Sequence, residues 1–381
     1  MPGDSRGTVL VISPSIGIGG REKIAINTVR SFERLGYHAI LVIFQRCGVE
    51  YPFHGEMINL NVPAKKNAIG KITAQIRRSI KLLHLRKKYK TQFAYSLGDA
   101  SNIANVLSGI THLGKSIISL HVFGEVNKSI VSKFIFHKAD KLICIAQDMR
   151  HYLLMLYPRL KNVTVIENGY ELSQIDRKEM EASSFPRLVV MGRLTKQKGL
   201  SRLIKALKMV RQSIPDAKLT IVGKGELEAE LKALADRLEL RNAVAFQGYL
   251  SNPIPVLQAS DIYTMTSYSE GFPNALIEAL NCGLPVVAAD CRSGPREILS
   301  ATYMPEPIQG IKHEKYGVLV EESADGFEER FAEAVLQLWN NKKEMAYYRE
   351  TAPQRAKDFS LERYQEKLKK LLDDCGYEST Q

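Results

Sequence analysis

The chain has 381 residues, which is more than one ordinary core needs and suits two domains, and its 45% of hydrophobic residues excludes a disordered or fibrous protein. It carries 53 Lys and Arg against 41 Asp and Glu, a formal net charge of +12 that is unevenly spread. The sequence has no signal-peptide pattern, no run of about 18 apolar residues and no CxxC pair, so we expect a cytoplasmic protein without a membrane span, a disulfide framework or a zinc site.

Short β-rich runs alternate with helical patterns along the first half of the chain, which predicts parallel βαβ units. The expected strands span residues 8–12, 38–44, 57–60, 93–96, 116–120, 141–145 and 163–166. Helices are expected between them, including residues 22–35 and a long basic helix at 69–89.

The pattern begins again after residues 168–186, a polar and unpatterned stretch that we interpret as an interdomain linker. The expected strands span residues 187–191, 218–222, 243–246, 261–266, 285–289 and 317–320. The expected helices span residues 200–212, 226–237, 274–281, 324–348 and 361–372.

These elements predict an α/β protein with two Rossmann-like, doubly wound parallel-sheet domains. We expect an N-terminal domain at residues 1–170, a C-terminal domain at 187–350, and a final segment at 351–381 whose helix returns toward the N-terminal domain. Ligands of doubly wound sheets bind at the carboxyl ends of the strands. The cleft between the two domains is therefore the expected site.

The most informative segment is SYSEGFPNALIEALNCGLPVV at residues 267–287, which reads as loop, helix, glycine stop and strand. The free N–H groups and the dipole of the helix N-terminus favour a phosphate there. Glu270, in the loop, is suited to accept hydrogen bonds from sugar hydroxyls, and Glu278, within the helix, from a ribose diol. Singly, each acid would be explained as a helix-capping or surface residue. The expected donor-binding residues of the loop are Gly271, Phe272, Pro273 and Asn274.

This segment resembles the signature of the family 4 retaining glycosyltransferases, in which two glutamates are separated by seven residues, as Glu270 and Glu278 are here. The resemblance covers nearly the whole chain. It implies the two-domain GT-B architecture, with the acceptor bound by the N-terminal domain and the nucleotide sugar by the C-terminal domain. It also implies that Glu270 positions the donor sugar, that Glu278 holds the ribose, and that the acceptor attacks on the face from which the diphosphate leaves.

A second segment, MGRLTKQKG at residues 191–199, joins a strand to a helix. Arg193 and Lys198 lie in this loop, from which cations can reach a diphosphate. The resemblance implies that both neutralise the leaving diphosphate, and we place Gly192 beside them in the donor site. Without this context, such cations would be interpreted as solvated surface residues.

A glycine-rich loop, SIGIGGRE at residues 15–22, follows the first strand. It is not a clean GxGxxG pattern, and the next strand ends in Gln45 and Arg46 instead of the ribose-binding acid, so a dinucleotide site is disfavoured. The resemblance implies that Gly19 and Gly20 lie against the donor phosphates and the acceptor.

His121 follows the strand at 116–120 and falls at its carboxyl end. A lone histidine is more often structural, but the resemblance implies a contact with the donor sugar. The expected catalytic residues are Glu270, His121, Arg193 and Lys198. Gly248 and Tyr249 resemble the loop that binds the nucleobase, whereas Asn168, Gly169 and Glu297 belong to family segments that we interpret as structural.

No DxD carboxylate pair follows a strand, so neither a metal ion nor another cofactor is expected. Arg193, Lys198 and the helix N–H groups would then have to stabilise the leaving group without a metal.

The cations are concentrated in one window, since no acid occurs between Glu56 and Asp99. The window holds Lys65, Lys66, Lys71, Arg77, Arg78, Lys81, Arg86, Lys87, Lys88 and Lys90. Apolar residues recur at helical spacing beside these cations, at Ile69, Ile72, Ile76, Ile80 and Leu83. The pattern indicates an interfacial helix at Lys65–Lys90 on an anionic membrane. The alternative is that the apolar stripe packs on the domain's own sheet and the cations are solvated.

We therefore expect a cytoplasmic enzyme on the inner face of the membrane. It would move a hexose or N-acetylhexosamine from a nucleotide-diphosphate sugar, by default UDP-linked, to a lipid-linked glycan acceptor in cell-surface polysaccharide or glycolipid biosynthesis. Alternatives of the same fold are a nucleotide-sugar epimerase and a sugar phosphorylase. The alternative from another class is a basic nucleic-acid-binding protein, which the lack of aromatic residues interleaved with the cations disfavours.

Overall fold

The fold is described from a computed structural model, which describes residues 6–17, 20–47, 52–65, 67–111, 113–172, 183–323 and 325–376. The chain forms two compact units. Unit 1 contains Met1–Glu171 together with Phe359–Gln381, and unit 2 contains Leu172–Asp358. Of the expected site residues, Gly19 lies outside the described residues, as does Lys66 of the basic window.

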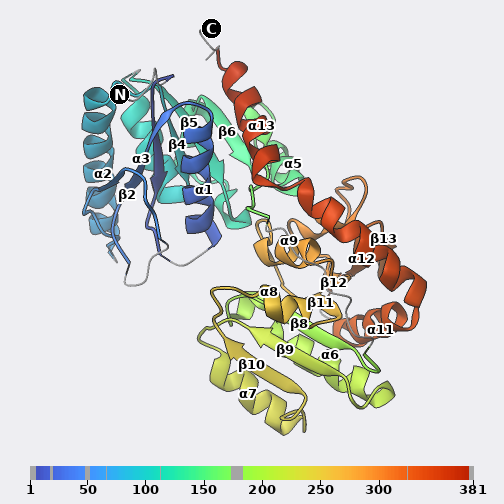
Figure 1. The fold of residues 1–381 in the computed structure, drawn as a ribbon. Helices are drawn as coiled ribbons and strands as arrows, with labels where there is room; N and C mark the ends of the chain where they lie inside the picture. The colour runs from blue at the N-terminus through green and yellow to red at the C-terminus, as the bar shows by residue number, and fades with distance from the viewer. Residues whose placement is uncertain are drawn as a thin grey trace. The chain divides into compact units, whose positions relative to one another are not determined.

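Unit 1 is built on a seven-stranded sheet with the order β3-β2-β1-β4-β5-β6-β7 (Figure 1). Its strands are β1 (Thr8–Ser13), β2 (His38–Ile43), β3 (Met57–Asn59), β4 (Phe93–Leu97), β5 (Lys115–Leu120), β6 (Lys141–Cys144) and β7 (Val163–Val165). Every neighbouring pair is parallel. The winding direction reverses between β1 and β4, and this position is where doubly wound sheets bind ligands.

Helices cover both faces of this sheet. They are α1 (Gly20–Arg34), α2 (Ala68–Lys88), α3 (Asp99–Gly109), α4 (Ile130–Lys138), α5 (Gln147–Leu156) and α13 (Leu361–Asp373), with a 3₁₀ turn at Phe123–Glu125. Helix α3 contacts both α2 and α4, so these three share one face, while α13 packs on α1. The core between sheet and helices is aliphatic, with Leu10, Ile12, Ile40 and Val42 fully buried.

Unit 2 repeats the design, with the strand order β10-β9-β8-β11-β12-β14-β13. Its strands are β8 (Arg187–Met191), β9 (Lys218–Val222), β10 (Val244–Gly248), β11 (Ile262–Met265), β12 (Val286–Ala289), β13 (Ile311–Glu314) and β14 (Gly317–Val320). Its helices are α6 (Leu200–Ser213), α7 (Glu228–Arg237), α8 (Ile254–Gln258), α9 (Asn274–Asn281), α10 (Pro295–Leu299), α11 (Phe327–Asn340) and α12 (Lys342–Lys357). Only the β13–β14 pair is antiparallel. The two sheets confirm the predicted α/β class with two Rossmann-like domains.

Several elements differ from the sequence-based expectation. The helix expected at residues 324–348 is two helices, α11 and α12, because the chain turns at Asn341, whose side chain accepts a hydrogen bond from the Glu344 N–H and caps α12. Strand β13 and the short helices α8 and α10 were not predicted. Among the described residues, no helix has the length and apolar character needed to cross a membrane.

The basic helix α2 also corrects part of the predicted membrane surface. Two of its cations, Arg78 and Arg86, are buried. Arg78 donates hydrogen bonds of 3.1 and 2.8 Å to the Val62 carbonyl, and Arg86 donates to the hydroxyls of Ser108 and Ser116. Both were expected at the surface because charge favours solvent, but here backbone and hydroxyl oxygens satisfy the guanidinium groups inside the unit.

The apolar stripe of α2 faces outward. Ile69 is 77% exposed, and Ile72, Ile76 and Ile80 are exposed as well. The helix packs on its unit through Ala74, Arg78, Leu82 and Arg86 instead. The alternative in which the stripe packs on the domain's own sheet is therefore wrong.

Candidate active site

The candidate site of unit 2 lies at the carboxyl ends of β8 and β11, which are neighbours in the sheet. The loop after β8 carries Arg193 and Lys198, and the loop after β11 carries Ser267 and Glu270. The strand order of the unit reverses between these two strands. The polar residues of both loops therefore lie at the position where doubly wound sheets bind their ligands.

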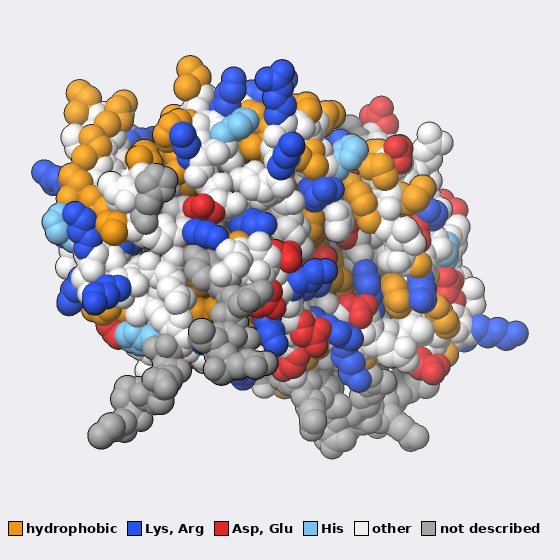
Figure 2. All heavy atoms as spheres, turned by 90° about the horizontal axis from the view of Figure 1, so that it is seen from above, with side chains coloured by type: hydrophobic (Ala, Val, Ile, Leu, Met, Phe, Trp, Pro, Cys, Tyr) orange, Lys and Arg blue, Asp and Glu red, His pale blue; other side chains and the backbone are white. Residues whose placement is uncertain are grey.

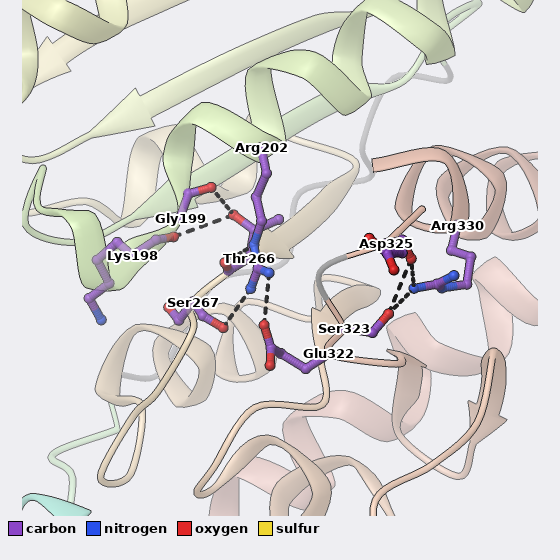
Figure 3. Close-up of polar contacts among 9 residues, drawn as sticks. All are labelled: Lys198, Gly199, Arg202, Thr266, Ser267, Glu322, Ser323, Asp325 and Arg330. Atoms are coloured by element: carbon purple, nitrogen blue, oxygen red, sulfur yellow. Dashed lines mark hydrogen bonds and ion pairs between the residues drawn. The ribbon is translucent and has the colours of Figure 1, made fainter. Parts of the chain in front are cut away.

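Gly199 brings the two loops together (Figure 3). Its φ of +60° lies in the left-handed region, and a Cβ atom at this position would lie 2.1 Å from the Thr266 carbonyl oxygen. The Thr266 hydroxyl in turn donates a 3.0 Å hydrogen bond to the Gly199 carbonyl. Only glycine permits this approach without displacing backbone.

Lys198 and Glu270 form an ion pair at the centre of the site. The Lys198 Nζ atom lies 2.6 Å from Glu270 Oε1, and the Ser267 hydroxyl donates a 2.5 Å hydrogen bond to the same oxygen. The Glu270 side chain is only 8% exposed. Both hydrogen bonds are charge-assisted, so they hold the buried carboxylate in one orientation, and the Lys198 cation compensates its charge.

The backbone of Glu270 is held as well. Its N–H donates a 2.6 Å hydrogen bond to the Arg292 carbonyl, and its carbonyl accepts a 2.9 Å bond from the Ser293 N–H. The Ser293 hydroxyl donates a 2.6 Å hydrogen bond to the Gly271 carbonyl. The loop is therefore tied to the segment after β12, and Glu270 is positioned through both its backbone and its side chain.

The N-terminus of α9 follows the β11 loop. Pro273 precedes the helix without a side-chain cap, so the positive end of the helix dipole lies at the end of this loop. Phe272 is buried beneath the loop, and Asn274 is the first helical residue. The arrangement suits an anionic group beside Lys198.

Glu278 lies on α9, and its charge acts on the same β11 residue as the charge of Glu270. Burial raises the pKa of Tyr263 in β11, and the charges of Glu270 and then Glu278 raise it further. Burial and then the Glu278 charge also raise the pKa of the Cys282 thiol to about 12. Both glutamates of the sequence signature therefore lie within electrostatic range of Tyr263 in β11.

The other expected donor residues line neighbouring strand ends. Gly192 follows β8, where a Cβ atom would lie 3.1 Å from Cε of Lys198. Gly248 ends β10, and its carbonyl accepts a 2.8 Å hydrogen bond from the Gly223 N–H. The side chains of Arg193 and Tyr249 are exposed. All these residues belong to unit 2, whereas Gly20 and His121 belong to unit 1.

Arg202 is a residue of this site that the sequence did not reveal (Figure 3). Its guanidinium donates to the carbonyls of Thr266 at 2.7 Å and Ser267 at 3.0 Å, and to Glu322 at 2.9 Å. It lies between the rings of Tyr268 and Phe327, 4.0 and 3.8 Å from their centroids. Arg202 therefore fixes the backbone from which Ser267 reaches Glu270. No sequence signal points to it, because Glu322 lies 120 positions away.

In unit 1, His121 lies at the carboxyl end of β5, next to the point where the sheet order reverses. Its backbone N–H donates a 2.7 Å hydrogen bond to Glu125 Oε2. Its Nε2 atom is buried and has no hydrogen-bond partner among the residues that the structure describes. Burial and the Arg21 charge lower the pKa of His121 to about 3, so the imidazole is neutral.

Glu125 is the second titratable group of this cluster. Burial raises its pKa to about 7, and the charge of Asp99 raises it, while the His121 N–H and Arg21 lower it. Gly20, the first residue of α1, is exposed beside Arg21. A neutral imidazole with an unpaired buried nitrogen is suited to bind a hydroxyl group.

The described residues also bear on whether a metal site is present. Over the described ranges, no group of three or more His, Cys, Asp or Glu side chains is arranged to hold an ion.

The sequence and the fold are similar to those of known proteins. Residues 173–355 match the sequence family described as Glycosyl transferases group 1. The chain is thus a glycosyltransferase, and this family's sequence lies in its second half. An uncharacterized glycosyltransferase of Methanocaldococcus jannaschii is 28% identical over 388 residues, which cover 91% of this chain and 95% of the relative.

A further relative of the glycosyltransferase is 30% identical over 237 residues, 61% of this chain and 60% of the relative. It is the N-acetylgalactosamine-N,N'-diacetylbacillosaminyl-diphospho-undecaprenol 4-alpha-N-acetylgalactosaminyltransferase of Campylobacter jejuni. Among solved structures, HepE of Anabaena in complex with UDP aligns with a TM-score of 0.75 at 19% identity, over 96% of this chain and 100% of that chain. TarM of S. aureus, also in complex with UDP, aligns with a TM-score of 0.76 at 14% identity, over 96% and 99%. These structures confirm the GT-B fold of the glycosyltransferase.

Proposed function

We propose that the protein transfers a hexose or N-acetylhexosamine, with retention of configuration, from a UDP-sugar to a lipid-linked glycan acceptor in cell-surface polysaccharide or glycolipid biosynthesis. The observation that carries this proposal is the Lys198–Glu270–Ser267 arrangement at the N-terminus of α9. The UDP bound to HepE and TarM and the diphospho-undecaprenol substrate named for the Campylobacter relative support the choice of donor and acceptor.

The leaving diphosphate would be stabilised by Arg193, Lys198 and the first N–H groups of α9. Lys198 carries three N–H donors and directs one of them to Glu270, so the others remain for phosphate oxygens. Preorganised donors aimed at the charge that develops on a leaving group supply the largest catalytic effect in such reactions. On this proposal the reaction needs neither a metal ion nor another cofactor.

Glu270 would accept hydrogen bonds from hydroxyls of the donor sugar, and Glu278 from those of the ribose. The acceptor hydroxyl would attack on the face from which the diphosphate departs, and a phosphate oxygen would take its proton as the glycosidic bond to phosphate breaks. Glu270 then orients the sugar and acts neither as nucleophile nor as base. His121, neutral and with a buried unpaired Nε2, would bind a sugar hydroxyl at the carboxyl edge of unit 1.

A donor panel tests the proposal. UDP-sugars should raise the melting temperature more than the GDP- and ADP-sugars do, since a ligand that binds only the folded state stabilises it. Product analysis then separates the same-fold alternatives. An acceptor-linked sugar supports transfer, an altered free nucleotide sugar indicates an epimerase, and a sugar phosphate indicates a phosphorylase.

Membrane association through α2 is the second part of the proposal. The exposed stripe of Ile69, Ile72, Ile76 and Ile80 lies beside exposed cations on a helix without acids. An interfacial helix of this kind would place the enzyme on the inner face of the cytoplasmic membrane, near a lipid-linked acceptor. The exposed cations of the window are Lys65, Lys71, Arg77, Lys81, Lys87, Lys88 and Lys90. Of these, Lys81 also donates a 2.7 Å hydrogen bond to the Leu60 carbonyl.

Vesicle co-sedimentation tests this part. Changing Lys71, Arg77, Lys87 and Lys88 together to Gln should abolish binding to anionic vesicles, because each cation near such a surface contributes about 1 kcal/mol. Arg78 and Arg86 are left unchanged because they are buried. Binding that ignores these changes, the anionic lipid and the salt would contradict the proposal, and binding to duplex DNA would favour the nucleic-acid alternative.

A further inference from the structure

Helix α4 presents a second set of exposed apolar side chains on unit 1. Ile130 is 88% exposed, Val131 52% and Phe134 43%. All three lie in the first five residues of the helix. Exposed apolar side chains that cluster in this way often mark a surface that binds a partner or a membrane.

The opposite side of α4 is firmly packed, so these side chains cannot turn inward. Ile135 and Phe136 are buried, and the Phe136 ring meets Tyr157 edge-on at 5.6 Å. The Asn162 amide donates hydrogen bonds to the carbonyls of Phe136 at 3.2 Å and Ala139 at 2.7 Å. Ser129 caps the other end by accepting a 3.0 Å bond from the Ser132 N–H.

The charged residues in the segment that carries α4, residues 126–139, have one sign. No acid occurs between Glu125, which is buried, and Asp140. Three exposed cations, Lys128, Lys133 and Lys138, lie in that interval. Apolar side chains flanked only by cations are complementary to a surface that offers hydrocarbon beneath anionic groups.

Helix α4 shares its face of the sheet with α2. Helix α3 contacts both, and both run antiparallel to the strands they follow, so each begins near the carboxyl edge of the sheet. The first turns of α2 and α4 therefore present Ile69, Ile72, Ile130 and Val131 toward the same edge of unit 1. Figure 2 shows orange hydrophobic side chains projecting among blue Lys and Arg side chains along one margin of the surface.

We infer that α4 is a second membrane-inserting element, and that an anionic lipid bilayer binds unit 1 along the shared face of α2 and α4. This inference rests on the membrane association proposed above and adds an orientation to it. A single helix leaves a protein free to rotate about that helix, whereas two separate points of insertion fix which edge approaches the lipid. This edge holds His121, which follows β5 and lies nine residues before the start of α4.

The first experiment compares full-length variants on vesicles of phosphatidylcholine with and without phosphatidylglycerol. The triple variant Ile130→Gln, Val131→Gln, Phe134→Gln should bind the anionic vesicles about tenfold more weakly than the natural protein. The control is Met155→Gln, an exposed apolar residue on α5, which should bind as the natural protein does. Both variants should retain transfer to a short water-soluble acceptor, which shows that the fold survives.

A second measurement does not depend on weakened binding. Tryptophan emission from Phe134→Trp should shift to the blue when anionic vesicles are added, and emission from Met155→Trp should not. Undiminished binding of the triple variant, or an unshifted Phe134→Trp spectrum, overturns the inference. If the α2 variant alone loses binding, α2 docking stands and α4 insertion is wrong. If α4 variants change self-association instead of vesicle binding, the face binds a second copy of the chain and the inference is wrong.

Discussion

The two units differ in how the titratable side chains of the candidate sites at their carboxyl edges are paired. In unit 2, Glu270 is held by Lys198 and Ser267, and Arg202 secures the backbone beneath them. In unit 1, the buried Nε2 of His121 and Nε of Arg21 have no hydrogen-bond partner among the described residues. Side chains that hydrogen-bond to one another are held in place before a ligand binds. A buried polar atom without a partner lacks a hydrogen bond that a ligand can supply. On the proposed function, the paired edge of unit 2 would bind the leaving diphosphate, and the unpaired edge of unit 1 would bind a sugar hydroxyl.

The largest effect is expected when the pairing in unit 2 is broken at its centre. Lys198→Ala removes a charge-assisted contact to the proposed diphosphate and leaves Glu270 without its cation. We expect kcat/KM to fall about 30- to 1000-fold, or about 2–4 kcal/mol, and Arg193→Ala to cause a loss of similar size. Initial rates with saturating acceptor provide the measurement.

Lys196→Ala is the matched control, because Lys196 is an exposed lysine of the same loop. It should keep nearly full activity. Equal losses for Lys196→Ala and Lys198→Ala would mean that the loop contributes only its general charge.

A smaller effect is expected when the support of Glu270 is removed. Arg202→Met releases the carbonyls of Thr266 and Ser267, and a displacement of about 1 Å in a catalytic loop costs up to about 100-fold in rate. The variant is paired with Glu322→Gln so that no uncompensated carboxylate remains. We expect kcat to fall about 10- to 100-fold while UDP binding, measured by calorimetry, is nearly unchanged.

Lys205→Met on the same helix serves as the comparison, since its side chain is 53% exposed. Loss of UDP affinity in proportion to kcat would show that Arg202 supports the whole unit instead of positioning Glu270.

The unpaired edge of unit 1 should show itself in the pH dependence of stability. The pKa of Glu125 is raised to about 7, so the native state holds a proton that the unfolded state loses near pH 4.5. The contribution of Glu125 to stability is therefore lost as pH rises from about 4.5 to about 7, by up to about 3 kcal/mol. Glu125→Gln keeps an acceptor for the His121 N–H and removes this loss, so its advantage in melting temperature should grow from pH 5 to pH 8.

His121 acts in the opposite direction. Its pKa is lowered to about 3, so the unfolded state takes up a proton first and stability is lost as pH falls below about 6.5. The effects of Glu125 and His121 on stability partly cancel in the natural protein. In Glu125→Gln only the effect of His121 remains, so the stability of this variant should fall on acidification. A difference between the two proteins that is constant from pH 5 to pH 8 would show that Glu125 is not protonated in the native state.

The smallest effect is expected on removal of metal. Activity should persist in excess EDTA, because the cations of the proposed donor site and the N–H groups of α9 would replace a metal clamp. Activity that is lost in EDTA and restored by Mn²⁺ or Mg²⁺ would show that a divalent ion binds with the donor.

The sequence predicted the layout of the fold more fully than the contacts of the site. Strand β8 and helix α9 begin and end at the predicted residues, because a buried strand or a helix bounded by glycine and proline carries its own pattern. Strand β13, with the sequence IKHE, has no apolar alternation and exists because β14 pairs with it. Its formation depends on a neighbour and not on its own residues.

The residues of the candidate site follow the same division. Lys198 and Glu270 could be placed at strand ends from local patterns, but their ion pair, and the clamp that Arg202 forms with Glu322, join segments far apart in the chain. The buried positions of Arg78 and Arg86 likewise depend on which side of α2 faces the sheet. A charged residue predicts solvent on average, and only the packed structure shows which guanidinium groups are enclosed.

The last helix has a consequence for the order in which the protein can be made. Helix α13 belongs to unit 1, where the Tyr364 hydroxyl lies 2.9 Å from that of Thr28 and the Leu361 N–H donates to the Tyr170 carbonyl. A ribosome completes the whole of unit 2 before it reaches these residues. The side of α1 that binds α13 therefore stays exposed until the end of synthesis. Chains that end at residue 358 should remain bound by chaperones, although unit 2 within them is already protected from proteases.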